Sequence, residues 1–278
     1  MLTSSVHHGC TIINHQMTIF YVGTGRPYWL WKKEPDHPFF VSVRTISLVK
    51  KLKPATRNWA CDSGGFTELK MNGTWKTTPE WYVDELRRIT DKIGNLDFAS
   101  QQDWMCEPHM LENTGFDVEK HQRLTCENFC RLQELGPELP IIPVLQGWYP
   151  DEYRRHVEMF AEYGVDLRKH PTVGVGSVCR RTKFQGMTEL FYDLHGYGLK
   201  MHGFGLKKDA FVKFGECLQS SDSMAWVTWG RFEGNRGNKL CGTDHPAATC
   251  TNCYEWSQIW ADSVVGKYEL LGLNTLKK

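Results

Sequence analysis

The stretch "TTPEWYVDELRRITDKIGNLDFASQQDW", residues 77–104, predicts a helix, a strand and a polar strand end in direct succession. Thr78 can cap a helix whose first position is Pro79, and Gly94 ends that helix. A short apolar run over Leu96–Ala99 then leads into "SQQDW". Apolar residues of the helix recur at i, i+4, i+7 and i+11, on one face: Tyr82, Leu86, Ile89 and Ile93.

Strand-like and helix-like runs alternate in the same way along the rest of the chain. Such alternation is typical of a parallel sheet with helical crossovers, and eight strands favour a closed (β/α)8 TIM barrel, an α/β fold, over an open doubly wound sheet. Strands are expected at Ile19–Val22, Pro38–Ser42, Trp59–Cys61, Leu96–Ala99, Pro140–Leu145, Thr172–Gly176, Met201–Phe204 and Ser220–Met224. Further helices are expected at about Asp117–Leu135, Asp151–Tyr163, Met187–Leu194 and Lys208–Cys217.

Polar or glycine-rich residues follow six of the expected strands. In barrels of this kind the active site lies at the carboxyl ends of the strands, so these segments should face one shared bowl. They are "DSGG" at 62–65, "SQQDW" at 100–104, "QGW" at 146–148, "GVGSVCRR" at 174–181, "HGFGLKK" at 202–208 and "SDSMAW" at 221–226.

The composition excludes several classes of protein. With 278 residues, 41% of them hydrophobic, the chain can bury a large core. It has no apolar run of about 18 residues and no basic flank before an apolar segment, so neither a membrane span nor a secretory signal is expected, and a cytoplasmic location is predicted. The nucleotide fingerprints GxGxxG and GxxxxGK[ST] do not occur between a strand and a helix, which disfavours a dinucleotide or ATP enzyme.

Three regions are expected along the chain. Residues 1–16 are polar and lack a period, so they are predicted to form a disordered extension. Residues 17–230 form the barrel, and residues 231–278 form a small metal-binding subdomain with a C-terminal helix. Although the net charge is only +1, twelve basic residues stand against six acidic ones over residues 168–239, so one face could meet a polyanion.

Three aspartates lie at or just past strand ends: Asp62, Asp103 and Asp222. Carboxylates crowded into one bowl shift one another's pKa values apart, which equips a site for nucleophilic and acid/base roles. A carboxylate pair beside a sugar carbon allows substitution with retention through a covalent intermediate. The alternative for each aspartate alone is a helix cap or a turn.

Other residues at these strand ends suit a flat polar ligand. The segments "SGG" and "GVGSV" leave backbone amides approachable. Gln146 can donate and accept at once, as a nucleobase edge requires, and Phe66 and His202 could stack on a base. Core packing is the alternative for Phe66.

The segment "CGTDHPAATCTNC" predicts a structural zinc site. Its C-x3-H-x4-C-x2-C spacing supplies four ligands, which fill a tetrahedral shell and leave no open position. Asp244 could replace His245, and ten cysteines scattered over a large chain leave free thiols as the alternative. The four expected ligands are Cys241, His245, Cys250 and Cys253.

Basic residues after the last three strands predict contacts with a phosphate backbone that crosses the bowl. Solvated surface charge is the alternative for each of them, and it is the preferred interpretation for Lys207 or Lys208 taken alone. The expected backbone contacts are Arg180, Arg181, Lys183, Arg231 and Arg236.

Several motifs resemble the 7-deazaguanine transglycosylases, which include the tRNA-guanine transglycosylases. "DSGGF", "VLQG" and "SSDSM" are similar to segments of that family, and Asp97 and Asp103 repeat its two aspartates six residues apart. A closer resemblance is to the DNA-directed branch, the deazapurine DNA modification proteins of the DpdA family, found in phages and bacterial genomic islands. It extends from Ile19 to about Trp260 and is carried by "FYVGTGRPYWL", "WACDSGGFTEL", "QQDWMCEP", "PVLQGW", "VGVGSVCRR", "HGFGLK" and "SDSMAW".

The resemblance implies an exchange of guanine in DNA for a free 7-deazaguanine base, such as 7-cyano-7-deazaguanine or a derivative, without breakage of the backbone. It implies Asp222 as the nucleophile on the sugar C1′ and Asp62 as the general acid/base. The guanine would be single-stranded or flipped from the duplex, and a helper protein or a homodimer stays open. The residues implied in binding the base are Ser63, Gly64, Phe66, Asp103, Gln146, Gly147, Gly174, Gly176, Ser177, His202 and Gly203.

Departures from the family pattern bear on the substrate. The tRNA members have a Met where His202 stands, a Pro-Thr-Arg run in place of "AWVTWGR", and a C-x-C-x2-C zinc set with a distant His. These differences favour DNA over tRNA. Two alternatives remain: a tRNA-guanine transglycosylase, and an inactive zinc-containing nucleic-acid-binding protein.

Overall fold

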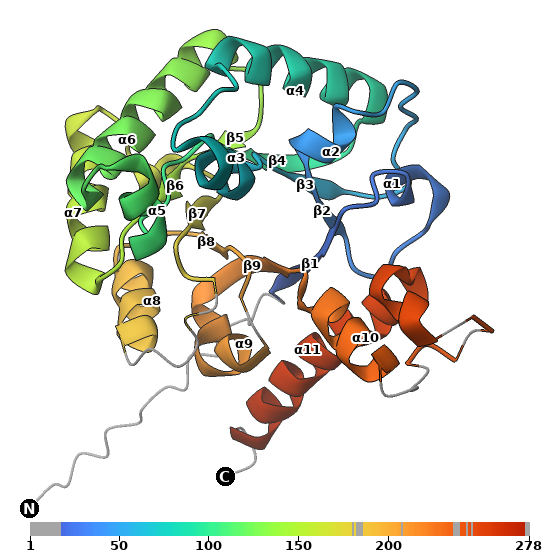
Figure 1. Cartoon of the computed structure of the whole chain (residues 1–278). Coiled ribbons are helices and arrows are strands. Elements are labelled where there is room, and N and C mark those ends of the chain that lie inside the picture. Colours follow the sequence, from blue (N-terminus) through green and yellow to red (C-terminus); the bar gives the residue numbers. More distant parts are fainter. Residues whose placement is uncertain are drawn as a thin grey trace, which may run out of the picture.

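A computed structural model describes residues 18–179, 181, 186–206, 208–235, 240–242, 244–245 and 247–275. Within these residues, nine parallel strands form one sheet in the order β5-β4-β3-β2-β1-β9-β8-β7-β6, which curves into a nearly closed barrel surrounded by helices (Figure 1). The strands are β1 Ile19–Thr24, β2 Phe39–Ser42, β3 Trp59–Asp62, β4 Leu96–Ser100, β5 Ile141–Ile142, β6 Val144–Leu145, β7 Val173–Val175, β8 Met201–Gly203 and β9 Leu218–Ser223. The predicted α/β barrel is confirmed.

The expected strand Pro140–Leu145 is divided at Pro143 into β5 and β6. β5 pairs with β4 and β6 pairs with β7, so the two pieces join the two halves of the sheet. Pro143 has no N–H for a ladder, but its carbonyl accepts from the Gly174 N–H at 2.8 Å. The side chain of Gln101 fills part of the break, because its Oε1 accepts from the Val144 N–H at 3.3 Å. Counted as one kinked strand, β5 and β6 complete the eight strands of the prediction.

The long helices form where the sequence places them. α4 Pro79–Ile93 is capped by Thr78, whose side chain accepts from the Trp81 N–H, and Gly94 ends it at φ 65°. α6 Val118–Leu135 is capped in the same way by Asp117, whose side chain accepts from the Lys120 N–H, and Gly136 ends it. α7 Pro150–Glu162 shares with α4 a proline at its first position. The other helices are α1 Trp29–Lys32, α2 Val43–Ile46, α3 Gly65–Asn72, α5 Pro108–Thr114, α8 Gly186–Gly196, α9 Lys208–Phe214, α10 Ala225–Asn235 and α11 Tyr254–Thr275, with 3-10 turns at Leu167–Lys169, Gly215–Cys217 and Ala247–Asn252.

Two hydrophobic layers hold the barrel. The main core lies between the sheet and the helices; for example, the Phe20 ring packs 5.5 Å from that of Phe211 on α9 and 5.6 Å from that of Trp260 on α11, measured between centroids. A smaller cluster fills the interior of the barrel with side chains from β1 to β5, packed against Phe204. Its members are Tyr21, Phe40, Ala60, Phe98 and Ile142.

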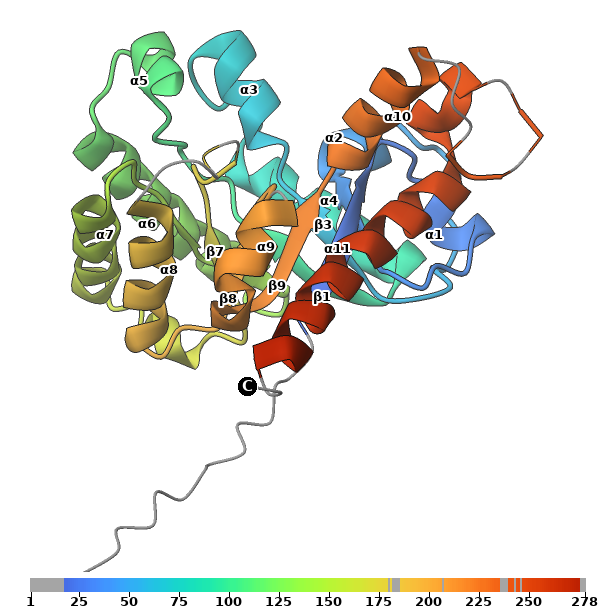
Figure 2. The ribbon, with the colours of Figure 1, turned by 90° about the horizontal axis from the view of Figure 1, so that it is seen from below.

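Helices that follow the strands rise around the carboxyl end of the barrel. α3 and α5 stand on one side of this end and α10 on the other (Figure 2). α10 runs through residue 230, the expected end of the barrel domain, and its Trp226 donates from Nε1 to the Gly23 carbonyl of β1 at 2.8 Å. The expected domain limits stay a prediction, and residues 1–16 lie outside the described part of the chain. None of the helices in the described residues is both long enough and apolar enough to cross a membrane.

Candidate active site

The turn after β3 presents Asp62 at the barrel mouth. Gly64 follows at φ 78°, and its N–H donates to Asp62 Oδ2 at 2.9 Å. A Cβ at Gly64 would lie 2.4 Å from Arg44 Cδ, so both the backbone conformation and the close approach favour glycine here. The buried Ser63 fixes the turn from the other side, since its N–H donates to Ser100 Oγ of β4 at 2.9 Å.

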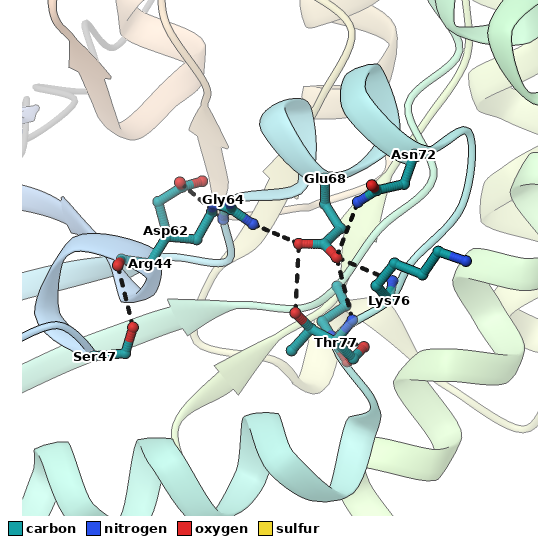
Figure 3. A network of polar contacts seen from close by, with 9 residues as sticks. Arg44, Ser47, Asp62, Gly64, Glu68, Asn72, Lys76 and Thr77 are labelled. Atoms are coloured by element: carbon teal, nitrogen blue, oxygen red, sulfur yellow. Dashed lines mark hydrogen bonds and ion pairs between the residues drawn. The ribbon is translucent and has the colours of Figure 1, made fainter.

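Behind this turn lies a buried carboxylate that the sequence analysis did not identify. Glu68 of α3 is 4% exposed and accepts from Arg44 Nη1 at 2.5 Å (Figure 3). It also accepts from the backbone N–H groups of Lys76 and Thr77 at 3.0 and 3.2 Å. Glu68 thus ties α3 to the loop before α4 and holds Arg44 against Gly64. In the sequence, Glu68 looks like an ordinary acid in the first turn of a helix.

Asp222 lies near the end of β9 and is 7% exposed. Its Oδ1 accepts from the Gly205 N–H at 2.9 Å and lies 3.3 Å from His202 Nε2. The other ring nitrogen of His202, Nδ1, lies 2.8 Å from Ser220 Oγ. The imidazole is therefore placed between two side chains of the neighbouring strand.

Asp103, Gln146 and Ser177 form one buried chain of polar contacts. Gln146 Nε2 donates to Asp103 Oδ2, and Gln146 Oε1 lies 2.6 Å from Ser177 Oγ. Ser177 Oγ also lies 2.8 Å from Glu107 Oε2 and accepts from the Cys106 N–H at 2.8 Å. The structure therefore brings together residues from three of the predicted strand ends and adds Glu107, which lies in the quoted segment "QQDWMCEP" but was not assigned a role.

The expected base-binding glycines approach neighbouring side chains closely. A Cβ at Gly176 would lie 2.1 Å from Gln146 Nε2, and one at Gly174 would lie 2.5 Å from Phe204 Cε2. A Cβ at Gly203 would likewise lie 2.4 Å from Leu206 Cδ1, and one at Gly147 would lie 2.9 Å from Tyr153 Cδ2. These glycines let the side chains between the strand ends fit, and their part in binding a base stays a prediction.

Burial, together with the charges of neighbouring carboxylates, raises the pKa values of Asp62 and Asp103 at the mouth. Burial, and secondarily the charge of Asp222, raises the pKa of Asp62 to about 6. Burial also raises the pKa of Asp103 to about 7, against the hydrogen bond from Gln146, and the charges of Asp62 and Glu107 add to the rise. Near neutral pH this site can therefore both hold and release protons, which suits acid/base chemistry.

The two rings expected to stack on a base lie in different surroundings. Phe66 is 43% exposed on α3, and its ring centroid lies 6.2 Å from that of His109 on α5. His202 has no exposed surface and is enclosed by the inner aromatic cluster. Phe66 is therefore accessible to a ligand in this structure, whereas His202 is not.

The structure describes part of the predicted basic rim. Arg231 is exposed on α10, whereas Arg181 is 7% exposed and lies with its guanidinium 3.8 Å from the centre of the Trp148 ring. Arg181 donates to the carbonyls of Ser177 and Trp148, and its burial lowers its pKa. It therefore joins the loops after β6 and β7 instead of facing solvent. The expected contacts Arg180, Lys183 and Arg236 lie outside the described residues.

A group of side chains after α10 could hold a metal ion. The ligand atoms of Cys241, His245 and Cys253 lie within 4.8 Å of one another. Cys250 Sγ lies 3.9 Å from Cys241 Sγ, close to the sulfur separation of about 3.8 Å that tetrahedral zinc coordination gives. The carbonyl of Cys250 lies 2.8 Å from where a Cβ on Gly230 would be, so this loop packs tightly against α10.

A cavity of about 790 Å³ opens at the opposite end of the barrel, among the amino ends of the strands. Asp97 lines it, and its two oxygens accept from Tyr21 Oη at 2.8 Å and Asn58 Nδ2 at 2.6 Å. Asp97 is the second residue of β4 and Asp103 lies three residues past its last residue, so the two aspartates of the motif lie towards opposite ends of the barrel. The mouth, at the other end of the barrel, carries the grouped acids, among them Asp62 and Asp103 with raised pKa values, so the mouth is the candidate active site.

Replacement of Asp103 by Asn is expected to stabilise the fold as the pH rises. The raised pKa means that ionisation of Asp103 disfavours the folded state, so stability is lost as the pH rises from about 4, the ordinary value of an aspartate, through about 7. Asp103→Asn removes this loss and should raise the free energy of unfolding at pH 8 by on the order of 1–4 kcal/mol, with little gain at pH 4.5.

Urea unfolding at both pH values measures this difference. Asp84→Asn, on the exposed face of α4, is the matched control and is expected to give a small change that does not depend on pH. Equal effects of Asp103→Asn at both pH values would contradict the raised pKa.

Comparison with known proteins identifies the family. A search of curated proteins finds no match. The family DpdA, deoxypurine in DNA protein A, matches residues 16–274, which is nearly the whole chain and includes every strand of the barrel. The chain therefore belongs to the DpdA family.

Proposed function

We propose that this protein is a DNA-guanine transglycosylase, which exchanges guanine in DNA for a free 7-deazaguanine base. Membership in the DpdA family implies DNA as the substrate and suggests this class of reaction. The observation that carries the proposal is the pair of carboxylates at the barrel mouth, Asp222 from β9 and Asp62 from β3, in which the charge of one raises the pKa of the other.

In the first step, a guanosine that is unstacked from its neighbours enters the mouth, because its C1′ cannot be reached inside a duplex. A carboxylate oxygen of Asp222 forms an ester bond to C1′ as the bond from C1′ to guanine N9 breaks. The electron pair of the broken bond leaves with the guanine, and Asp62 in its protonated form gives that base a proton.

In the second step, the incoming 7-deazaguanine loses its N9 proton to ionised Asp62 and attacks C1′. The ester to Asp222 breaks and its electron pair returns to the carboxylate. Two inversions at C1′ restore the β-anomer, and Asp62 ends in its starting state. One glycosidic bond replaces another, so the reaction needs no ATP.

The charge of Asp222 explains how Asp62 can alternate between the two roles. In the free enzyme, burial and the charge of Asp222 together raise the pKa of Asp62 to about 6, which favours the protonated form of Asp62. In the covalent intermediate Asp222 is an uncharged ester, so the pKa of Asp62 falls and the base form is favoured.

The polar chain at Asp103, Gln146 and Ser177 is proposed to recognise the base. Guanine and 7-deazaguanine share N1–H and an exocyclic amino group, two donors that a carboxylate can accept side by side. Gln146 and Ser177 support Asp103 in this role because their contacts fix the orientation of the amide. We propose that Phe66 stacks on the base, which its 43% exposure allows.

Base exchange can be measured with labelled guanine and a single-stranded DNA oligonucleotide. The wild type is expected to transfer label into the DNA. Asp222→Asn should transfer none and form no covalent adduct on a denaturing gel, and Asp62→Asn should exchange at least about 10²-fold more slowly.

Asp84→Asn is the control and should exchange at the wild-type rate. Label in tRNA but not in DNA would favour the tRNA alternative. DNA binding without exchange in the wild type would favour an inactive binding protein.

The pH dependence of the two half-reactions is expected to run in opposite directions. The value of kcat/KM for DNA should fall as the pH rises through about 6, because the free enzyme needs protonated Asp62. The value of kcat/KM for the free base should fall as the pH drops, because the covalent intermediate needs ionised Asp62. The midpoint of this fall should lie at a lower pH than the midpoint of the fall in kcat/KM for DNA. Two limbs with the same midpoint would contradict the effect of the Asp222 charge.

We propose that Cys241, His245, Cys250 and Cys253 hold a structural zinc ion. Four protein ligands leave zinc no open position, so the ion would supply folding energy and take no part in the chemistry. The ion would fix the loop that packs on α10.

Metal analysis is expected to find one zinc per chain, and a chelator should lower Tm, because the ion binds the folded state only. Cys253→Ser should lose the zinc and the response of Tm to chelator, whereas Cys130→Ser on α6 should keep both. A zinc-free protein with an unchanged Tm in chelator would overturn the assignment.

A further inference from the structure

His202 is placed by strand pairing directly against the proposed nucleophile. β8 and β9 pair so that His202 lies opposite Ser220. Because side chains two residues apart share a face of a strand, Ser220 and Asp222 point to the same side and the imidazole reaches both. The distances are 2.8 Å from Nδ1 to Ser220 Oγ and 3.3 Å from Nε2 to Asp222 Oδ1.

Aromatic rings hold the imidazole in this position. Four rings lie with their centroids 4.8 to 5.9 Å from that of His202, and three of them meet it edge to face. The side chain has no exposed surface, so it cannot turn towards solvent without displacing this cluster. The four rings are Tyr21, Phe40, Phe98 and Phe204.

The partners of the two nitrogens determine the tautomer. An ionised Asp222 only accepts hydrogen bonds, so Nε2 must carry a proton to bond with it. In a neutral imidazole Nδ1 is then an acceptor, and the Ser220 hydroxyl can donate to it. One proton on Nε2 and one on the Ser220 hydroxyl therefore give each ring nitrogen of this buried imidazole a hydrogen-bond partner.

Both contacts that the structure describes at the Asp222 carboxylate go to the same oxygen. His202 Nε2 and the Gly205 N–H converge on Oδ1. Gly205 is at φ 61°, and a Cβ there would lie 2.9 Å from Cys179 Sγ, so this backbone donor is itself fixed by local packing.

We propose that His202 is a positioning residue that binds Asp222 Oδ1 and thereby aims Oδ2 at the sugar C1′. This inference rests on the proposed function. When the ester breaks in the second step, negative charge returns to the carboxylate, and the two donors at Oδ1 stabilise it as an oxyanion hole does. His202 therefore assists the release of Asp222 from C1′ in the second step more than the attack of Asp222 on C1′ in the first. This role differs from stacking on the base.

Two substitutions of His202 distinguish the roles of its two ring nitrogens. The amide nitrogen of Gln lies near the position of Nε2 and can still donate to Asp222, whereas that of Asn lies near Nδ1 and reaches only Ser220. His202→Gln is expected to keep base exchange within about tenfold of the wild type. His202→Asn should lower kcat/KM for the free base by about 10²-fold or more, with a smaller fall in kcat/KM for DNA.

A readout other than turnover distinguishes positioning from folding. In His202→Asn the ester should break more slowly than it forms, so a larger fraction of the enzyme should be found as covalent adduct with DNA on a denaturing gel. A purely structural role predicts that both half-reactions fall together and that the adduct fraction does not rise. Equal exchange by the Gln and Asn variants, when both are folded by circular dichroism, would also overturn the proposal.

The nitrogen-15 spectrum of the imidazole tests the geometry without any substrate. The signal of His202, assigned by its absence in His202→Gln, is expected to show a proton on Nε2 and none on Nδ1. A proton on Nδ1 alone would overturn the proposal even if exchange occurs. No exchange by the wild type, together with the expected tautomer, would instead overturn the proposed function and leave the contact between His202 and Asp222 in place.

Discussion

The pairing of β1 with β9 closes the barrel, and the arrangement of the active site depends on it. This pairing joins segments roughly 200 residues apart and sets Tyr21 opposite Asp222. From there the register passes through β2, where Ser42 lies opposite Asp62 at the end of β3. The separation between the two proposed catalytic carboxylates is therefore fixed by the hydrogen-bonded ladders that join β9, β1, β2 and β3, and no loop has to hold it.

The same closure makes the mouth electrostatically costly. Burial raises the pKa values of Asp62 and Asp103, and the charges of carboxylates from other strand ends add to the rise. The apolar layers of the fold offset this cost. The buried charge of Glu68 behind the site adds little to it, because its oxygens accept from several donors. A site that alternates between acid and base requires such unfavourable ionisation, so we interpret the cost as part of its function.

Local patterns in the sequence were sufficient to predict the barrel but not the contacts at its mouth. The face of α4 and its cap depend on spacing along the chain, and the structure confirms them. The sequence cannot tell which of the adjacent basic residues after β7 is exposed and which is buried. It does not indicate that Arg181 lies buried on Trp148, because that contact depends on how two loops meet. Glu68 and His202 illustrate the same limit, since their partners come from other elements of the fold. The kink in the fifth strand had a visible signal in Pro143, whose missing N–H weakens a central strand.

The region after the barrel is connected to the site through α10. Trp226 joins this helix to β1 by a hydrogen bond to the Gly23 carbonyl, and the Trp226 carbonyl accepts from Trp256 Nε1 of α11 at 2.9 Å. Cys253, one of the proposed metal ligands, lies three residues before Trp256, and the backbone of Cys250 packs against α10 at Gly230. Because α10 starts three residues after Asp222, a metal ion bound in this loop would restrict the movement of the strand end that carries the proposed nucleophile. A metal ion at the proposed site would thus contribute to the precision of the proposed active site, although it is remote from the chemistry, because it would hold the supporting helix in place.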